Sequence, residues 1–313
     1  MSPLDFGPLI FGGNVFGWTA DADTSFDLLD RFTAAGGFAI DTADSYSAWH
    51  PGNTGGESEE IIGEWLRRRG KRDHLVIATK VCSHPQRPGL APENIRAAID
   101  DSLRRLGTDY VDLYFAHRDD PDVGQAEYLG AFEELVQAGK IREIGASMFT
   151  PERIRSASVV ARSEFSRGFT ISQDRYSLVE RGLETEVLPT LAELGIVEQP
   201  FAALAAGFLS GKYRADHAAG AGDSPRAAGA RKYLEDPRNL ELLAVLDDVA
   251  AGHGVQPGSV AIAWLRGQEN TTAPLASVRS AEQLPTLIDS FGLELSASEL
   301  ADLTRASAHA VGQ

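Results

Sequence analysis

Short apolar runs alternate with longer amphipathic segments along most of the chain. The runs are rich in β-branched and aromatic residues, as in buried strands, and the amphipathic segments repeat apolar residues at helical spacing. Strands are predicted at residues 9–11, 38–40, 75–80, 111–117, 141–147, 169–173, 196–201 and 273–278. Helices are predicted at residues 23–35, 57–69, 92–106, 125–138, 151–163 and 182–194, with two more within 237–268.

Strands that alternate with helices predict an α/β fold with a parallel sheet. Eight such repeats favour a closed (β/α)8 barrel, the TIM barrel, over an open sheet. A barrel of this kind takes ~250 residues. We therefore interpret residues 1–313 as a single barrel domain.

One connection is too long for an ordinary barrel loop. It runs from residue 207 to residue 236, after the seventh strand, and is rich in Gly, Ala, Arg and Asp. Long loops inside compact domains are usually functional lids or disordered segments. Its basic residues are Lys212, Arg214, Arg226, Arg231 and Lys232.

Titratable side chains stand at the carboxyl ends of three predicted strands. Asp41 follows the second strand and begins the turn Asp-Thr-Ala-Asp-Ser-Tyr, which ends at Tyr46. Lys80 ends the third strand and His117 ends the fourth. Polar groups inside a core are costly unless they are paired, and parallel barrel strands end at one mouth. The four side chains are therefore expected to converge at a candidate catalytic site.

The four residue types suit the protonation of a carbonyl oxygen. A nearby ammonium should lower the pKa of Tyr46, and Asp41 should keep Lys80 charged and oriented. His117 can donate a hydrogen bond to the oxygen, while Tyr46 supplies the proton as the carbon accepts hydride. Because none of these groups can supply a hydride, the mechanism requires a nicotinamide cofactor.

The cofactor is not expected to bind as in a Rossmann fold, since no Gly-x-Gly-x-x-Gly turn follows an early strand. Barrels commonly bind phosphate after strands seven and eight. The basic loop and the last strand-helix turn, at residues 277–280, are the candidates for the phosphate groups.

Composition narrows the compartment and the partners. The formal net charge of -16 argues against nucleic acid or an anionic membrane as a partner. The single cysteine, Cys82, allows neither an internal disulfide nor a cysteine metal site, so no metal is predicted. The amino terminus shows no basic stretch followed by an apolar core, and no apolar segment reaches ~18 residues, so a cytoplasmic protein is expected.

Several motifs resemble those of the aldo-keto reductases, in particular the prokaryotic branch related to potassium-channel β subunits. The resemblance runs from about Leu9 to Leu300 and keeps the order of the motifs. The motifs are Asp-Thr-Ala-Asp-Ser-Tyr at 41–46, Gly-Glu-Ser-Glu at 56–59, Ala-Thr-Lys at 78–80, Ala-His-Arg at 116–118, Gly-Ala-Ser at 145–147, Gly-Phe-Leu-Ser-Gly-Lys-Tyr at 207–213 and Ala-Ile-Ala-Trp-Leu at 261–265.

The resemblance implies a (β/α)8 barrel, NADPH-dependent carbonyl reduction, and a catalytic tetrad of Asp41, Tyr46, Lys80 and His117. It also implies cofactor contacts. Ser147 and Gln173 would bind the nicotinamide carboxamide, and Phe201 would stack on the ring. The loop over the pyrophosphate would comprise Leu204, Gly207, Leu209, Ser210, Lys212 and Arg214. The pocket for the 2′-phosphate and adenine would comprise Ser277, Arg279 and Gln283.

Arg279 favours NADPH over NADH, because a guanidinium binds a phosphate with two hydrogen bonds. Three residues depart from the family pattern, and one of them is Ala202, which replaces a common serine after the stacking aromatic. Met148 stands where an asparagine usually pairs with the serine, and Leu287 stands where an asparagine or glutamate usually contacts the adenine end.

Trp18 and Trp49 follow predicted strand ends, where they would either join the core or line the pocket of a small carbonyl substrate. Two other functions are open. One is a nicotinamide-binding regulatory or sensor subunit with little turnover, and the other is a barrel aldolase or lyase that uses Lys80 as a Schiff base. The physiological substrate, the favoured direction of reaction and the oligomeric state do not follow from the sequence.

Overall fold

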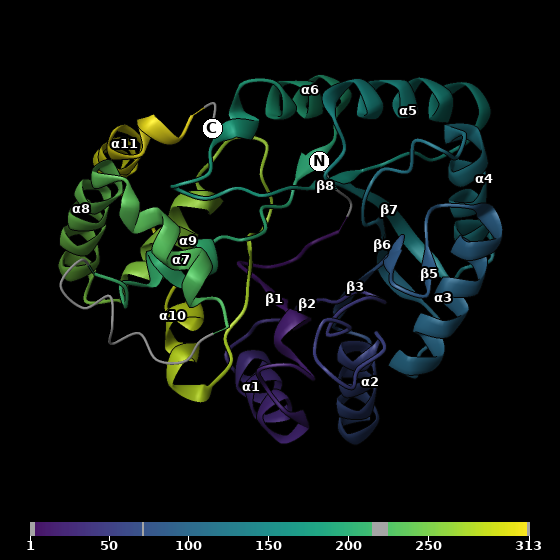
Figure 1. Cartoon of the computed structure of the whole chain (residues 1–313), viewed down its shortest axis with the longest axis horizontal. Coiled ribbons are helices and arrows are strands. Elements are labelled where there is room, and N and C mark those ends of the chain that lie inside the picture. The colour runs from purple at the N-terminus through teal and green to yellow at the C-terminus, as the bar shows by residue number, and fades with distance from the viewer. Residues whose placement is uncertain (1–3, 71, 215–224, 312–313) are drawn as a thin grey trace.

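Eight parallel strands form one sheet, and helices surround it (Figure 1). The structure is a computed structural model that describes residues 4–70, 72–214 and 225–311. The strand order is β10-β1-β2-β3-β6-β7-β8-β9. The strands are β1 Ile10–Gly12, β2 Ala39–Asp41, β3 Val76–Val81, β6 Val111–Ala116, β7 Ile141–Ser147, β8 Ile171–Gln173, β9 Val197–Glu198 and β10 Leu275–Ala276.

Backbone hydrogen bonds bring the two edge strands together. The Glu198 N–H donates to the Asn270 carbonyl at 2.9 Å, and the Thr272 N–H donates to the Glu198 carbonyl at 2.7 Å. The Leu275 N–H donates to the Pro200 carbonyl, also at 2.7 Å. The sheet therefore curls back on itself, and the predicted (β/α)8 class is confirmed.

Most predicted helices form close to their expected bounds, but the one predicted at 182–194 begins only at Val187, after a 3-10 turn at Gly182–Glu184. Their limits follow ordinary capping chemistry: α3 begins at Pro92, and Gly107 ends it in the left-handed conformation at φ 65°. The helices between and after the strands are α1 Ala22–Ala34, α2 Glu57–Arg69, α3 Pro92–Leu106, α4 Gln125–Gln137, α5 Pro151–Glu164, α6 Val187–Leu194, α8 Pro237–His253 and α9 Pro257–Arg266.

Some elements were not predicted. A small hairpin, β4 Ser83–His84 and β5 Arg87–Pro88, follows β3. A 3-10 segment, η3, spans Ala205–Ser210 and leads into the long loop, and a short helix, α7, spans Ala227–Lys232 within that loop. Part of that loop, residues 215–224, lies outside the described residues. Two further helices, α10 Leu284–Ile288 and α11 Ala297–Ala306, follow β10.

The core has two parts. Inside the barrel, Ile10, Leu113, Phe115 and Ile171 belong to a small apolar cluster, so the barrel interior is packed. A larger cluster joins the outer face of the strands to the helices. In the described part of the chain, no helix is long and apolar enough to cross a membrane.

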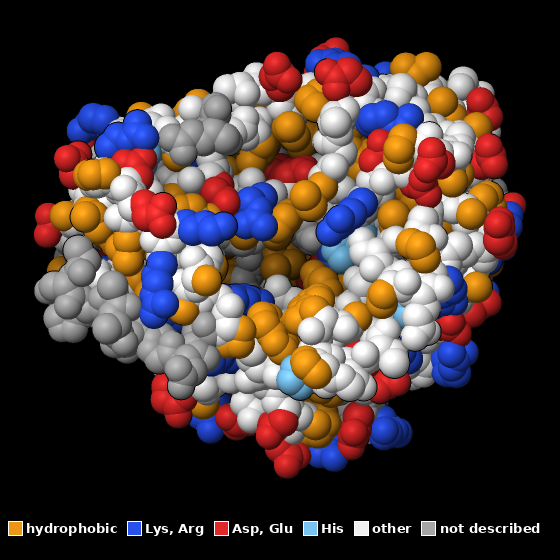
Figure 2. All heavy atoms as spheres, in the orientation of Figure 1, with side chains coloured by type: hydrophobic (Ala, Val, Ile, Leu, Met, Phe, Trp, Pro, Cys, Tyr) orange, Lys and Arg blue, Asp and Glu red, His pale blue; other side chains and the backbone are white. Residues whose placement is uncertain are grey.

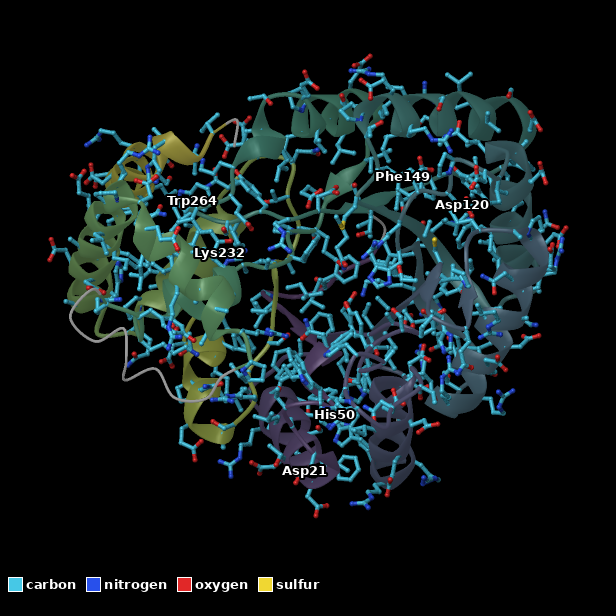
Figure 3. All side chains as sticks on the ribbon, in the orientation of Figure 1. Asp21, His50, Asp120, Phe149, Lys232 and Trp264 are labelled. Atoms are coloured by element: carbon cyan, nitrogen blue, oxygen red, sulfur yellow. The ribbon has the colours of Figure 1, made fainter. Side chains whose placement is uncertain are left out.

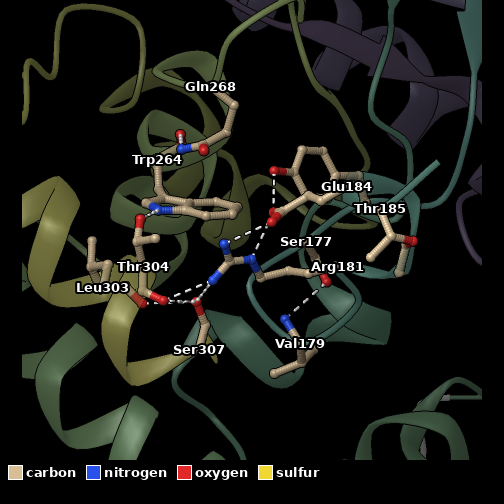
Figure 4. A network of polar contacts seen from close by, with 12 residues as sticks. Ser177, Val179, Arg181, Glu184, Thr185, Trp264, Gln268, Leu303, Thr304 and Ser307 are labelled. Carbon is tan, nitrogen blue, oxygen red and sulfur yellow. Dashed lines mark hydrogen bonds and ion pairs between the residues drawn. The ribbon is translucent and has the colours of Figure 1, made fainter. Parts of the chain in front are cut away.

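A buried arginine ties the last helix to the barrel (Figure 4). The Arg181 guanidinium donates to Glu184 at 2.7 and 2.8 Å and to the Ser307 hydroxyl at 2.8 Å. It also lies 5.3 Å from the ring of Trp264 in α9. These contacts hold α11 and α9 against the loop that follows β8, and so fix one side of the barrel mouth.

Candidate active site

Three predicted residues meet in one buried contact. Asp41 ends β2 and Lys80 lies in the neighbouring β3, and both side chains are 0% exposed. The Lys80 ammonium donates to Asp41 Oδ1, to the Thr42 carbonyl at 2.8 Å and to the Tyr46 hydroxyl oxygen at 3.0 Å. The Tyr46 hydroxyl in turn donates to Asp41 Oδ1 at 3.3 Å. The three side chains thus form a closed triangle.

Burial dominates the electrostatics of this triangle. Desolvation raises the pKa of Tyr46 well above 10.0, and the charge of Asp41 raises it further. Desolvation lowers the pKa of Lys80, and Asp41 opposes that shift. From the nearby ammonium alone we expected the pKa of Tyr46 to be lowered. It is raised instead, because the loss of solvent and the paired carboxylate both disfavour the phenolate. Tyr46 is therefore a neutral phenol at neutral pH.

His117 follows β6, Val111–Ala116, and faces the triangle. Its ring centroid lies 5.9 Å from that of Tyr46. Desolvation, followed by the charges of Lys80 and Arg118, lowers the pKa of His117 well below 6.5. Nδ1 of the ring is buried and has no hydrogen-bond partner among the described residues. His117 is thus a neutral imidazole with an unused polar atom at the site.

Gln173 links the triangle to the next strands. Its side-chain nitrogen donates to Asp41 Oδ2 at 3.0 Å and to the side-chain oxygen of Gln199 at 2.6 Å. Ser147, at the end of the neighbouring β7, is 2% exposed. Phe201 is half-buried, and the Arg175 guanidinium lies 5.4 Å from its ring. Ser147 and Gln173 end β7 and β8, and Phe201 lies just beyond the end of β9.

The candidate pyrophosphate loop has an unusual backbone. Ala205, Ala206 and Gly207 have φ of 46°, 57° and 93°, a left-handed run that residues with side chains rarely adopt. Such conformations cluster at functional sites. A Cβ on Gly207 would lie 3.1 Å from the Lys212 ammonium nitrogen, so glycine permits this close approach. Within the loop, the Ser210 hydroxyl donates to the Gly207 carbonyl at 2.6 Å.

The apolar residues of this loop pack inward. Leu209 is fully buried, and Leu204 is half-buried against the large core cluster. Arg214 is occupied by an ion pair, in which its guanidinium donates to both carboxylate oxygens of Asp247 in α8 at 2.6 and 2.7 Å. In the structure, therefore, Arg214 anchors the loop to a helix.

Three cations lie close to one another near this loop. Partial burial lowers the pKa of Lys212, and the charges of Arg279 and Arg226 lower it further. Neither Lys212 nor Arg279 has a carboxylate ion pair within residues 4–70, 72–214 and 225–311. Cations gathered in this way in an acidic protein would be stabilised by anions, and they fit the phosphate groups of a dinucleotide. Arg226 was not among the predicted site residues, although it was one of the basic residues noted in the loop.

The candidate adenine end lies after β10. The Ser277 hydroxyl donates to the side-chain oxygen of Asn14 at 2.8 Å, and the Arg279 N–H donates to the Gln283 side-chain oxygen at 3.1 Å. Leu287 is fully buried in α10. The departure at position 287 thus places an apolar side chain in the core.

Aromatic side chains stand beside Tyr46. The Trp18 and Trp49 rings lie 5.5 Å apart at right angles, and Trp49 lies 6.1 Å from Tyr46. Trp49 is 51% exposed, so it is not a core residue. The Arg226 guanidinium lies 5.5 Å from the Trp18 ring, so the basic residues near the long loop lie next to the two tryptophans.

The face of the molecule seen in Figure 2 has a central hollow, with apolar and basic side chains around its rim. Figure 3 shows this face with side chains as sticks, where Phe149 and Asp120 lie across the centre from Lys232 of α7. Among the described residues, no group of three or more His, Cys, Asp or Glu side chains could hold a metal ion.

Asp44 is a buried residue whose properties the sequence motif did not reveal. Its side chain is 0% exposed, and neither carboxyl oxygen has a hydrogen-bond partner among the described residues. Desolvation, followed by the charge of Glu59, raises the pKa of Asp44 to about 8, against the opposing charges of Arg105, Arg87 and Lys80. Asp44 is therefore a neutral acid close to the triangle.

Comparison with known proteins identifies the family of the chain. The family model of the aldo/keto reductases matches residues 8–308, and the chain belongs to that family. An aryl-alcohol dehydrogenase of Pestalotiopsis microspora is 31% identical, with 97% of this chain and 78% of that protein covered. A norsolorinic acid reductase of Emericella nidulans is 31% identical, with 97% and 77% covered. The oxidoreductase YrpG of Bacillus subtilis is 33% identical, with 92% and 88% covered.

Family membership establishes the general class of activity. The protein is an oxidoreductase of the kind that acts on carbonyl and alcohol groups of small molecules. Members of the family generally use a nicotinamide cofactor, either NADH or NADPH.

Proposed function

We infer that the protein is an NADPH-dependent reductase of aldehyde or ketone groups, which also oxidises the corresponding alcohols. The observation that carries this proposal is the buried triangle in which Lys80 contacts both Asp41 and the Tyr46 hydroxyl. When bound, the nicotinamide cofactor supplies the hydride to the carbonyl carbon.

Tyr46 is the proton donor in this proposal. Its raised pKa keeps the phenol protonated, and its hydroxyl is oriented by Asp41 and Lys80. As negative charge develops on the carbonyl oxygen, the Tyr46 hydroxyl transfers its proton to that oxygen. The Lys80 ammonium, 3.0 Å from the hydroxyl oxygen, then stabilises the phenolate. In alcohol oxidation the phenolate accepts the proton.

The other two members of the tetrad prepare the site. Asp41 stabilises the charged form of Lys80 against the cost of burial. His117, as a neutral imidazole, donates a ring N–H to the carbonyl oxygen and so orients it toward Tyr46.

Cofactor binding is assigned to two groups of residues. Ser147, Gln173 and Phe201 would hold the nicotinamide end, and the loop with Leu204, Gly207, Leu209, Ser210 and Lys212 would cover the pyrophosphate. Arg214 would support that loop through Asp247. Ser277, Arg279 and Gln283 would hold the 2′-phosphate and adenine. Arg279, without a carboxylate partner in the described chain, supports the preference for NADPH.

Aromatic carbonyl compounds are the first substrates to test. Trp18 and Trp49 offer ring faces and edges beside Tyr46, and such surfaces pack well against aromatic ligands. The names of two relatives, an aryl-alcohol dehydrogenase and a norsolorinic acid reductase, support the same choice.

The proposal is tested by titrating the purified protein with NADPH and with NADH while protein fluorescence is followed, and then adding an activated aromatic aldehyde. We expect tighter binding of NADPH and its oxidation after the aldehyde is added. Binding without oxidation of any aldehyde or ketone tested would favour a sensor protein. The absence of binding by either cofactor would overturn the proposal.

A further inference from the structure

Asp174 connects three segments at the nicotinamide end of the proposed cofactor site. It directly follows β8 and is 8% exposed. Its Oδ1 accepts the backbone N–H of Met148 at 2.9 Å, and its Oδ2 accepts the Ser172 hydroxyl at 2.5 Å. Its carbonyl accepts the N–H of Phe201, also at 2.9 Å. One residue thus contacts the turn after β7, the end of β8 and the segment after β9.

Met148 depends on such support. It follows Ser147 with φ 58°, in the left-handed region that residues with side chains seldom adopt. Its side chain is 55% exposed, so core packing does not impose this conformation. The Asp174 carboxylate is the contact that holds the Met148 N–H, and with it the turn that carries Ser147.

A second acid keeps Asp174 in place. Glu198 in β9 is 0% exposed, and its Oε1 accepts the Asp174 backbone N–H at 2.9 Å. Desolvation, followed by the charge of Asp174, raises the pKa of Glu198 well above 4.5, so Glu198 is a neutral acid that accepts the Asp174 N–H. Desolvation raises the pKa of Asp174, and its hydrogen bonds with Ser172 and with the Met148 N–H oppose that shift.

We propose that Asp174 is a positioning residue for the nicotinamide end of the cofactor, acting by holding the turn Ser147–Met148 in its left-handed conformation. This inference rests on the proposed function, because it takes Ser147 and Phe201 as cofactor contacts. Asp174 itself touches neither cofactor nor substrate. Its removal loosens a preformed binding surface and leaves the Asp41–Lys80–Tyr46 triangle intact.

The first test replaces Asp174 by alanine and measures the dissociation constant of NADPH by fluorescence titration. We expect the constant to rise about tenfold, the effect of losing one hydrogen bond to a backbone N–H, while kcat at saturating NADPH stays within about twofold of the wild type. Glu198→Gln is the matched control. The side-chain oxygen of a glutamine can still accept the Asp174 N–H, so the NADPH constant of this variant should equal the wild-type value.

The second test leaves Asp174 unchanged, so that a folding defect at that position cannot decide the outcome. Met148→Gly and Met148→Val both remove the thioether, but only valine opposes the left-handed conformation. We expect the valine variant to bind NADPH about tenfold more weakly than the glycine variant. In addition, Asp174→Ala should weaken binding less in the Met148→Gly background than in the wild type.

The outcomes of these tests distinguish a failure of the proposed function from a failure of the role proposed for Asp174. If the wild type binds neither cofactor, the proposed function fails. If the wild type binds NADPH, yet Asp174→Ala binds equally well, or the glycine and valine variants bind alike, the role of Asp174 is refuted and the proposed function stands. Equal losses of kcat and of cofactor affinity in Asp174→Ala would also refute it, because they would indicate general damage to the site.

Discussion

The buried carboxyl group of Asp44 leads to a prediction about stability and pH. Neither carboxyl oxygen of Asp44 has a hydrogen-bond partner among the described residues, and burial raises the pKa of this group from 3.8 to about 8. Between these values the folded protein holds a proton on Asp44 that the unfolded chain has lost. The folded state then binds more protons than the unfolded state, so its stability must fall as the pH rises.

The magnitude follows from the size of the shift. One pH unit in this range is worth ~1.4 kcal/mol for a single group. From about pH 5 to about pH 8 the wild type should therefore lose ~4 kcal/mol through Asp44 alone. Asp44→Asn removes this pH-dependent contribution to stability, because an amide does not titrate in this range. The burial of the amide does not vary with pH, so it cancels when the two pH values are compared.

The assay is urea unfolding of the wild type and Asp44→Asn across this range, followed by tryptophan fluorescence. The stability of the variant relative to the wild type should grow with pH by several kcal/mol. Asp44→Ala should show the same growth with a constant offset from its cavity. A difference that stays constant, or that shrinks as the pH rises, would mean that Asp44 is ionised in the folded state and paired with Arg105.

Two further predictions concern the phosphate groups. Arg279→Ala should raise the NADPH dissociation constant at least about tenfold and change that of NADH little, because a charge-assisted contact with the 2′-phosphate is lost. The control for net charge is Arg231→Ala, which removes an exposed arginine of α7. If Arg279→Ala weakened the binding of both cofactors equally, the assignment of Arg279 to the 2′-phosphate would be contradicted. Gly207→Ala should weaken binding of both cofactors, because position 207 has φ 93° and a Cβ there would approach Lys212. Gly252→Ala in α8, where a Cβ meets nothing within 4 Å, should leave binding unchanged, and similar titrations for the two alanine variants would argue against a built phosphate loop.

Much of the fold could be predicted from the pattern of apolar residues. The bounds of α2, α3 and β7 match the predicted ranges, because glycine, proline or a change of period marks their ends. The last two strands are much shorter than predicted. Pro200 and Pro274 lack the N–H that a strand ladder needs, so β9 and β10 pair over two residues each.

The sequence indicated which residues come together at the candidate site better than it indicated their pKa values. Asp41, Tyr46, Lys80 and His117 come together because parallel strands end on the same side of a barrel. The predicted direction of the shift in the Tyr46 pKa was wrong, because the shift depends on how completely the fold removes solvent from the triangle. The ion pair of Arg214 with Asp247 joins residues 33 positions apart, and no local pattern indicates it.

The burial of three acidic residues could not be predicted from the sequence either. Asp44, Asp174 and Glu198 resemble ordinary turn or strand-end residues in the sequence, where an exposed and ionised carboxylate is the usual case. Only the packing of β8 and β9, and of the helices around Asp44, shows that these groups are buried. Their consequences for pH dependence and for cofactor binding therefore required the structure.

The central claim is that Tyr46 donates the proton, and Tyr46→Phe tests it most directly. NADPH binding and turnover of an aromatic aldehyde should be measured on the same sample of this variant. We predict NADPH binding within about twofold of the wild type, with turnover lowered by roughly a hundredfold to ten-thousandfold, the usual contribution of a general acid. A Tyr46→Phe protein that binds NADPH and keeps most of its turnover would contradict the account.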